Sequence, residues 1–389
     1  MDFRYTEEQL AMRDTVQRFV ARSYDFERRR ALARSELGYS AEAWAQYAEL
    51  GLLGLPFPEA HGGLGGGGVD VMVVMEQVGR GLLLEPYLST VVLCGGLLRD
   101  FGSQAQQQAL LPRIASGKLK LALAAYEASG RYDLSHVAAT ATAAGGGWHL
   151  SGRKAVVLDA PSADCFLVSA RETGGLTDAE GIGVFLVPRA APGLQVLPYA
   201  TQSGARAADL QLSQVWVDAQ GALGEPGTGL AALQRSTDAA VAALCAEAAG
   251  IVAALNEATL AYLKSRKQFG VPIGAFQALQ HRMADMYIAE EQIRSMAIIA
   301  AVHADVAEAA QRRRAVSAAK AYIGQAARFV GQQAVQLHGA MGVVDDFIVS
   351  HYFKRLTMID MTLGDADFHL ARFADSANAT AGARHHGLP

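Results

Sequence analysis

The 389-residue chain has few charged residues and few cysteines. Only 19% of its residues are charged, against about 25% in an average soluble domain, and 51% are hydrophobic. The formal net charge of −4 and the pI near 6.2 argue against nucleic acid or an acidic membrane as the main partner. The three cysteines form no CxxC pair, which excludes a disulfide scaffold and a zinc ribbon and fits a reduced cytoplasm.

Targeting and membrane signals are also missing. The N-terminal MDFRYTEEQL has no apolar signal core, so we do not expect secretion. No segment of 18 or more residues is both apolar and free of charge, so no membrane span is predicted. A cytoplasmic location is therefore expected, and the apolar excess predicts more buried surface than usual.

Three common cofactor and metal signatures are absent. Six glycines lie within Gly62–Gly68, but Val69-Asp70 follows where a phosphate loop needs Lys-Ser or Lys-Thr. This cluster is therefore expected to be a structural turn. No GxGxxG opens a βαβ unit, which argues against a Rossmann site. The histidines show no HExxH spacing, so no metal site is predicted, and lone helical histidines such as His281 and His338 are expected to be structural.

The hydrophobic pattern divides the chain into three domains and a tail. Residues 1–120 have helical periodicity and begin with a capping box at Thr6-Glu7-Glu8-Gln9. Residues 121–225 alternate short Val, Thr and Leu runs with glycine turns, which indicates an antiparallel β domain. Residues 226–379 contain four long helical patterns, which indicate a four-helix bundle, and residues 380–389 form a tail. The predicted fold class is a multi-domain α+β protein.

Glu247 is the most informative single residue. Between Ala239 and Leu255 it is the only charge in 17 positions, so the segment is expected to be a buried helix, as in the core of an oligomer. Burial without a partner raises the pKa of a carboxyl group toward neutrality, which suits a general base. The alternative is a structural glutamate that pairs with a distant arginine, and the pattern by itself does not decide between them.

A second motif lies at the end of that helix. Arg266-Lys267-Gln268-Phe269-Gly270 leads through Val271-Pro272-Ile273 to Phe276-Gln277, and later to Met283-Ala284-Asp285-Met286. An arginine at a helix C-terminus before a glycine can bind a pyrophosphate, although ordinary helix ends share this composition.

These residues resemble the acyl-CoA dehydrogenase family of flavoproteins. The family pattern R-x-x-F-G-x-x-[IL] followed by F-Q-x-x-x-x-x-[LM]-A-[DE]-M matches this stretch. Three further motifs fall in the family's order. They are Pro58-Glu59-Ala60-His61-Gly62-Gly63-Leu64-Gly65, then Gly152-Arg153-Lys154 with Ala163-Asp164, and Gln336-Leu337-His338-Gly339-Ala340-Met341-Gly342.

The resemblance implies a helical domain, a β domain and a four-helix bundle, with FAD between the last two. It implies oxidation of an acyl-CoA to its enoyl-CoA in lipid β-oxidation: a carboxylate takes the α-proton, and the β-hydrogen leaves as hydride to flavin N5. It also implies an oligomer, at least a dimer, because two sets of residues from different chains serve one flavin. The residues implied to contact FAD are Arg266, Gln268 and Phe269 in one set and Gln277, Gln336 and Gly339 in the other.

The chain departs from the family pattern at the base. The usual catalytic Glu matches Leu363, which cannot accept a proton. Asp365 and Asp367 are nearby but displaced, and a role on the adenosine side of FAD or simple helix capping suits them at least as well. Some family members carry the base on the first bundle helix, where Glu247 lies, so Glu247 is the predicted base.

The β domain departs as well. The Thr or Ser that usually donates a hydrogen bond near flavin N5 matches Leu158. Flavin contacts from this domain are then expected from backbone amides near Tyr126 and Val157.

Resemblance to the small-subunit branch of pimeloyl-CoA and steroid side-chain acyl-CoA dehydrogenases leaves the assembly open between homo- and hetero-oligomer. The predicted electron acceptor is an electron-transfer flavoprotein. One alternative function is a non-catalytic partner subunit, and another is a flavin oxidase or monooxygenase. The acyl group is left open, because alanines such as Ala242 and Ala243 fit either a roomy pocket or close helix packing.

Overall fold

A computed structural model describes the backbone of residues 5–385 and the side chains of residues 5–376. Its contacts group the chain into two compact units. The bundle unit consists of Met1–Arg29, Gly68–Leu83 and Val241–Pro389, and the β unit consists of Arg30–Gly67 and Leu84–Ala240. The predicted tail begins inside a helix that continues to His385, and residues 386–389 lie outside the described part.

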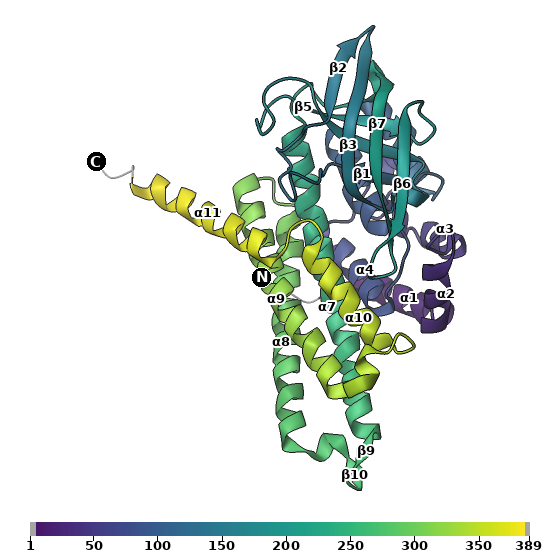
Figure 1. The fold of residues 1–389 in the computed structure, drawn as a ribbon, viewed down its shortest axis with the longest axis vertical. Coiled ribbons are helices and arrows are strands. Elements are labelled where there is room, and N and C mark those ends of the chain that lie inside the picture. The colour runs from purple at the N-terminus through teal and green to yellow at the C-terminus, as the bar shows by residue number, and fades with distance from the viewer. Residues whose placement is uncertain (1–4, 386–389) are drawn as a thin grey trace. The chain divides into compact units, whose positions relative to one another are not determined.

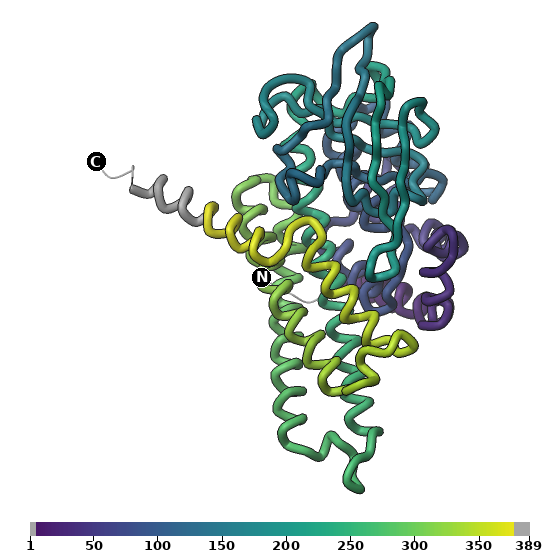
Figure 2. The backbone as a smooth tube through the Cα atoms, in the orientation of Figure 1, coloured from purple at the N-terminus to yellow at the C-terminus, as the bar shows by residue number. Residues whose placement is uncertain are grey.

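The bundle unit is built from long helices (Figures 1 and 2). Thr6 caps the first helix through the predicted capping box, which is confirmed. Helix α9 packs against α8, α10 and α11, and α4 packs against α1 and α8. The helices are α1 (Glu7–Ser23), α4 (Gly68–Gly81), α7 (Gly229–Ser265), α8 (Gln277–Ala304), α9 (Ala309–His338), α10 (Ile348–Met361) and α11 (Ala366–His385); α7 begins in the β unit and enters the bundle unit at Val241.

Helix α7 accounts for much of the apolar excess. By length and composition it could cross a membrane, but 83% of its most apolar 18-residue window is buried inside the protein. The residues from Ala240 to Val252 are all buried, as predicted. The chain itself therefore provides most of the burial that the sequence suggested an oligomer would supply.

The β unit combines short helices with one sheet. The helices are α2 (Phe26–Arg34), which begins in the bundle unit, α3 (Ala41–Glu49), α5 (Gly96–Phe101) and α6 (Gln104–Ala115), with short 3₁₀ turns and a π-helix at Leu88–Gly95. The strands are β1 (Leu121–Ala124), β2 (Thr140–Ala144), β3 (Gly147–Leu158), β4 (Cys165–Arg171), β5 (Ile182–Pro188), β6 (Leu194–Ala200), β7 (Arg206–Asp218) and β8 (Ala222–Leu223).

The sheet has the order β6-β7-β3-β2-β4-β5-β8, with β1 also paired to β4. Most pairs are antiparallel, as predicted, but β1 and β2 both pair with β4 in parallel. Gly145 and Gly146 both have positive φ between β2 and β3, as a two-residue hairpin turn requires. The inward side chains around Phe166 and Phe185 form an apolar core.

The glycine cluster is a structural turn, as predicted. The amide of Gly63 donates to Pro58 O, and an added Cβ at Gly63 would lie 2.0 Å from Phe57 O. The first amide of α4, at Gly68, donates to the Asp305 carboxylate over 2.6 Å. A protein carboxylate therefore occupies the helix terminus that a phosphate would need.

Candidate flavin-binding and proton-accepting residues

Glu247 lies in the middle of α7 and is paired with Arg355 of α10. Arg355 donates to both carboxylate oxygens, from Nε to Oε1 over 2.5 Å and from Nη2 to Oε2 over 2.7 Å. The Glu247 side chain is 2% exposed, and that of Arg355 is 21% exposed. A bidentate pair of this kind satisfies a buried carboxylate. This is the arrangement that the structural alternative for Glu247 requires, because the guanidinium bonds both oxygens and fixes the orientation of the carboxylate.

Two glycines place Glu247 by letting helices α4 and α7 cross closely. An added Cβ at Gly250 would lie 1.9 Å from Glu76 O, and one at Gly79 would lie 2.1 Å from Glu247 O. Only glycine permits this approach of two helix backbones. The segment that carries Glu247 is therefore fixed by backbone contact on one side and by Arg355 on the other.

The turn where the family base is expected contains no free carboxylate. Leu363 is buried and has a φ of +59°. Asp365 accepts a hydrogen bond from the amide of Phe368 and so caps α11. Helix capping was one of the roles that the sequence suggested for this residue. The turn is held by Lys320, which donates to the backbone oxygens of Asp360 and Gly364 over 2.9 and 2.6 Å. Burial is the largest influence on Lys320 and lowers its pKa to about 8.

The predicted residues Arg266, Gln268 and Phe269 lie together after α7. A hairpin of β9 (Lys267–Gln268) and β10 (Val271–Pro272) follows the helix, and Figure 2 traces it into α8. Phe269 has a φ of +52° and is 90% exposed. Such a side chain is stabilised when another surface covers it.

The predicted residues of the second set lie near the same end of the bundle. Gln277 is exposed at the first position of α8. Gln336 is exposed in the last turn of α9, and Gly339 follows with a φ of +57°. The Tyr262 ring of α7 lies 4.4 Å from the His338 ring, which joins the ends of α7 and α9. Glu247, by contrast, is roughly 30 Å from Arg266 along the axis of α7.

His338 is only partly satisfied. Its Nδ1 lies 2.8 Å from Ala334 O, so Nδ1 carries the proton, and the buried Nε2 has no partner among the described residues. Burial lowers the pKa of His338, which favours the neutral ring. This unpaired acceptor, next to Gly339 and close to Gln336 in sequence, fits a ligand with hydroxyl or amino donors, as FAD has.

In the β unit, β3 carries a bulge next to the predicted flavin contacts. The register against β7 shifts between Lys154 and Val157, so that Ala155 and Val156 lie opposite Asp209 alone. Val156 has a φ of +52° and is 55% exposed. A β-branched residue in the left-handed region is strained, and such strain often marks a functional site.

Two amides of this bulge are already used by the protein. The amide of Ala155 donates to Tyr126 O over 2.9 Å, and that of Val156 donates to Asp209 Oδ1 over 3.0 Å. These two amides are therefore not available to a flavin. Any flavin contact predicted for this part of the backbone has to come from neighbouring amides.

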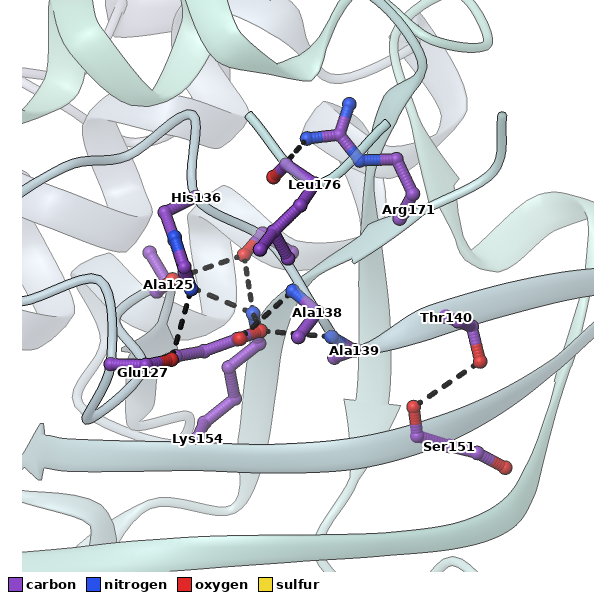
Figure 3. Close-up of polar contacts among 12 residues, drawn as sticks. Ala125, Glu127, His136, Ala138, Ala139, Thr140, Ser151, Lys154, Arg171 and Leu176 are labelled. Carbon is purple, nitrogen blue, oxygen red and sulfur yellow. Dashed lines mark hydrogen bonds and ion pairs between the residues drawn. The ribbon is translucent and has the colours of Figure 1, made fainter. Parts of the chain in front are cut away.

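A buried ion pair lies directly before the bulge (Figure 3). Lys154 Nζ donates to Glu127 Oε1 over 2.8 Å and to Ser169 Oγ over 2.9 Å. Glu127 also accepts the amides of Ala138 and Ala139 over 2.8 and 3.0 Å. Burial lowers the pKa of Lys154 to about 8, although Glu127 acts against the shift. Burial tends to raise the pKa of Glu127, but Lys154 and the two amides hold it below its ordinary value.

The sequence places Lys154 in a family motif but gives no sign that it pairs with Glu127. The two residues are 27 positions apart, and no local sequence pattern indicates a contact at that separation. Arg355 was missed for the same reason. Within the described residues, no three His, Cys, Asp or Glu side chains come together to hold a metal.

Comparison with known proteins identifies the fold. Family models match along the chain: Acyl-CoA dehydrogenase, N-terminal domain, at residues 6–118, middle domain at 122–215, and C-terminal domain at 227–377. Acyl-CoA dehydrogenase FadE27 of Mycobacterium tuberculosis is 32% identical over 378 residues, which are 96% of this chain and 97% of that protein.

Solved structures agree with this result. The Tcur3481-Tcur3483 steroid ACAD is 33% identical with a TM-score of 0.87, and the match covers 97% of this chain and 99% of that one. The ChsE4-ChsE5 complex from Mycobacterium tuberculosis is 29% identical with a TM-score of 0.85, and the match covers both chains completely.

The chain belongs to the acyl-CoA dehydrogenase family. It is an FAD-dependent oxidoreductase that dehydrogenates acyl-CoA, and the predicted fold class is confirmed. The family's solved structures include a heteromeric complex.

Proposed function

We propose that this chain introduces an α,β double bond into an acyl-CoA thioester as one subunit of an oligomer. When bound, FAD supplies the hydride acceptor. The hairpin of the bundle unit and the bulge of the β unit supply binding surface. The observation that carries the proposal is Phe269, an aromatic side chain that is 90% exposed beside Arg266. A flavin and a second subunit would cover this side chain, while the guanidinium binds pyrophosphate.

Two candidates remain for the group that takes the α-proton. Glu247 is the first, because it is a buried carboxylate on the first bundle helix. Its bidentate pair with Arg355 argues against it, since a base needs an oxygen lone pair directed at the substrate. The second candidate is a carboxylate of an unlike partner subunit. Leu363 at the usual position supports this candidate, and so does the similarity to a heteromeric complex.

The geometry favours the unlike partner. We therefore propose a hetero-oligomer in the cytoplasm, with an electron-transfer flavoprotein as the acceptor of the electrons.

The small side chains around Ala242 and Ala243 are buried in close helix packing, so they do not by themselves support a bulky acyl group. Similarity to a steroid ACAD supports a polycyclic acyl-CoA as the first substrate class to test.

A Glu247→Gln variant separates the two candidates. The purified assembly is mixed anaerobically with a panel of acyl-CoA thioesters, and bleaching of the flavin absorbance is followed by stopped flow. Loss of roughly 10²–10⁴-fold in the bleaching rate, with FAD still bound, would identify Glu247 as the base. An unchanged rate is expected if the base belongs to a partner. Glu257→Gln, on the same helix but in an exposed pair with Arg80, is the matched control.

The colour of the purified protein tests the assembly. A chain that is colourless alone and turns yellow with a co-expressed neighbour supports the hetero-oligomer. A yellow homo-oligomer that turns over acyl-CoA without a partner contradicts it. Hydrogen peroxide formed in stoichiometric amount during turnover in air would instead indicate a flavin oxidase.

A further inference from the structure

The bulge of β3 is held in a strained conformation from three directions. Val156 has a φ of +52° and is more than half exposed, so neither burial nor its own preference explains its conformation. The carboxylate of Asp209 accepts its amide and also the hydroxyl of Tyr199, over 3.0 and 3.1 Å. On the other side, the amide of Ala155 is bonded to Tyr126 O. Strain of this kind persists only where the surroundings over-determine it.

The third fixing point is the ion pair of Lys154 and Glu127. Lys154 is the last residue before the bulge, and Glu127 is the residue after Tyr126. The pair therefore joins the two segments one residue away from the hydrogen bond between Ala155 and Tyr126. The Lys154 side chain has no exposed surface, and that of Glu127 is 6% exposed.

Glu127 extends the connection to a third segment. Its two oxygens accept the amides of Ala138 and Ala139, so the loop after Glu127 returns to the same carboxylate (Figure 3). Arg171 holds the start of this return from the other side, because it donates to Ser135 O over 2.8 Å. A buried charge pair is a costly way to stabilise a core, since apolar side chains of similar size often do as well. Its position between three backbone segments suggests a more specific task.

We propose that Lys154 and Glu127 are positioning residues for the flavin, which hold the Val156 bulge and the Tyr126 segment at the fixed spacing that FAD binding needs. This inference rests on the proposed function, in which the backbone near Tyr126 and Val157 contacts the flavin. The pair itself is buried, so it would act through the backbone segments on either side of it.

The test uses a double variant, Glu127→Gln with Lys154→Met, in the assembly that binds FAD. Removal of Lys154 alone leaves a buried carboxylate without its partner and is expected to destabilise the fold. The double variant removes both charges and restores the neutrality of the core. If the pair only stabilises the fold, the double variant recovers both stability and FAD affinity.

The positioning role predicts a different outcome. The double variant then melts near the wild-type temperature, but its Kd for FAD rises on the order of tenfold. The flavin absorption band and the midpoint potential shift as well. Amide exchange of residues 125–128 and 154–158 becomes faster in the apo-protein. A wild-type Kd and potential in a folded double variant would overturn the inference.

Two further variants keep the test decisive. Ser169→Ala removes only the hydroxyl that accepts from Lys154, and we expect a smaller rise in Kd in the same direction; if the double variant fails to fold, an unchanged Kd and potential here overturn the inference. Arg235→Met breaks a partly exposed pair with Asp100 in the same unit and should leave the Kd unchanged. If the wild-type assembly itself binds no FAD, the proposed function fails, which differs from a wild-type Kd in the variants.

Discussion

Two of the buried carboxylates, Glu247 in the bundle unit and Glu127 in the β unit, are paired in different ways. Glu247 meets a planar guanidinium that bonds both of its oxygens and joins two helices. Glu127 meets a lysine, which bonds one oxygen, and two backbone amides. Arginine stays charged at any pH that a protein tolerates, whereas a buried lysine can lose its proton. The pair of Glu247 and Arg355 therefore joins two helices at every pH. The pair of Glu127 and Lys154 fixes backbone segments through a lysine that can lose its charge.

Breaking the arginine pair should have the largest effect. Arg355→Met leaves Glu247 buried without its partner, and we expect a loss of about 3 kcal/mol in the free energy of unfolding. This value is at the low end of the usual cost of breaking a buried ion pair, because Arg355 is partly exposed. Urea unfolding measures this loss. The double variant with Glu247→Gln should recover most of it, and a double variant as unstable as the single one would show that Arg355 acts through other contacts.

The close helix crossing beside Glu247 gives the next effect. Gly250→Ala places a Cβ 1.9 Å from Glu76 O, a backbone atom that cannot move without α4. We expect a loss of about 1–3 kcal/mol in unfolding free energy, measured by thermal melting. Gly96→Ala in α5 is the control, since an added Cβ there meets nothing within 4 Å. Equal melting temperatures for the two variants would contradict the crossing as the site of close contact.

The same contrast explains what the sequence could and could not predict. Periodicity identified α7 and its burial, because the 17 positions around Glu247 carry one charge. Motif spacing grouped Arg266, Gln268 and Phe269, which one hairpin holds together. The partner of Glu247 was beyond reach: Arg355 lies 108 positions away, and its contact depends on how α7 and α10 pack.

The β unit shows the same limit on a smaller scale. Alternating Val and Thr runs located most strands, but the bulge at Val156 depends on one extra residue in the register against β7. The residue types in Lys154-Ala155-Val156 do not predict a positive φ, and valine disfavours this conformation. Tertiary contacts from Asp209 and Tyr126 impose this conformation, and they appear only in the folded chain.

The pH dependence of stability separates the two pairs most directly. Burial lowers the pKa of Lys154 from 10.5 to about 8. Between these values the unfolded chain binds more protons than the folded chain at this site, so the contribution of Lys154 makes folding more favourable as the pH rises from about 8 to 10.5.

Comparison of wild type with the Glu127→Gln, Lys154→Met double variant should show a stability difference that shifts in favour of the wild type across this window. The Glu247→Gln, Arg355→Met double variant should show a constant difference, because arginine does not titrate there. Urea midpoints at pH 7.5, 9 and 10 measure both differences, and parallel curves for the two pairs would mean that Lys154 keeps its proton throughout.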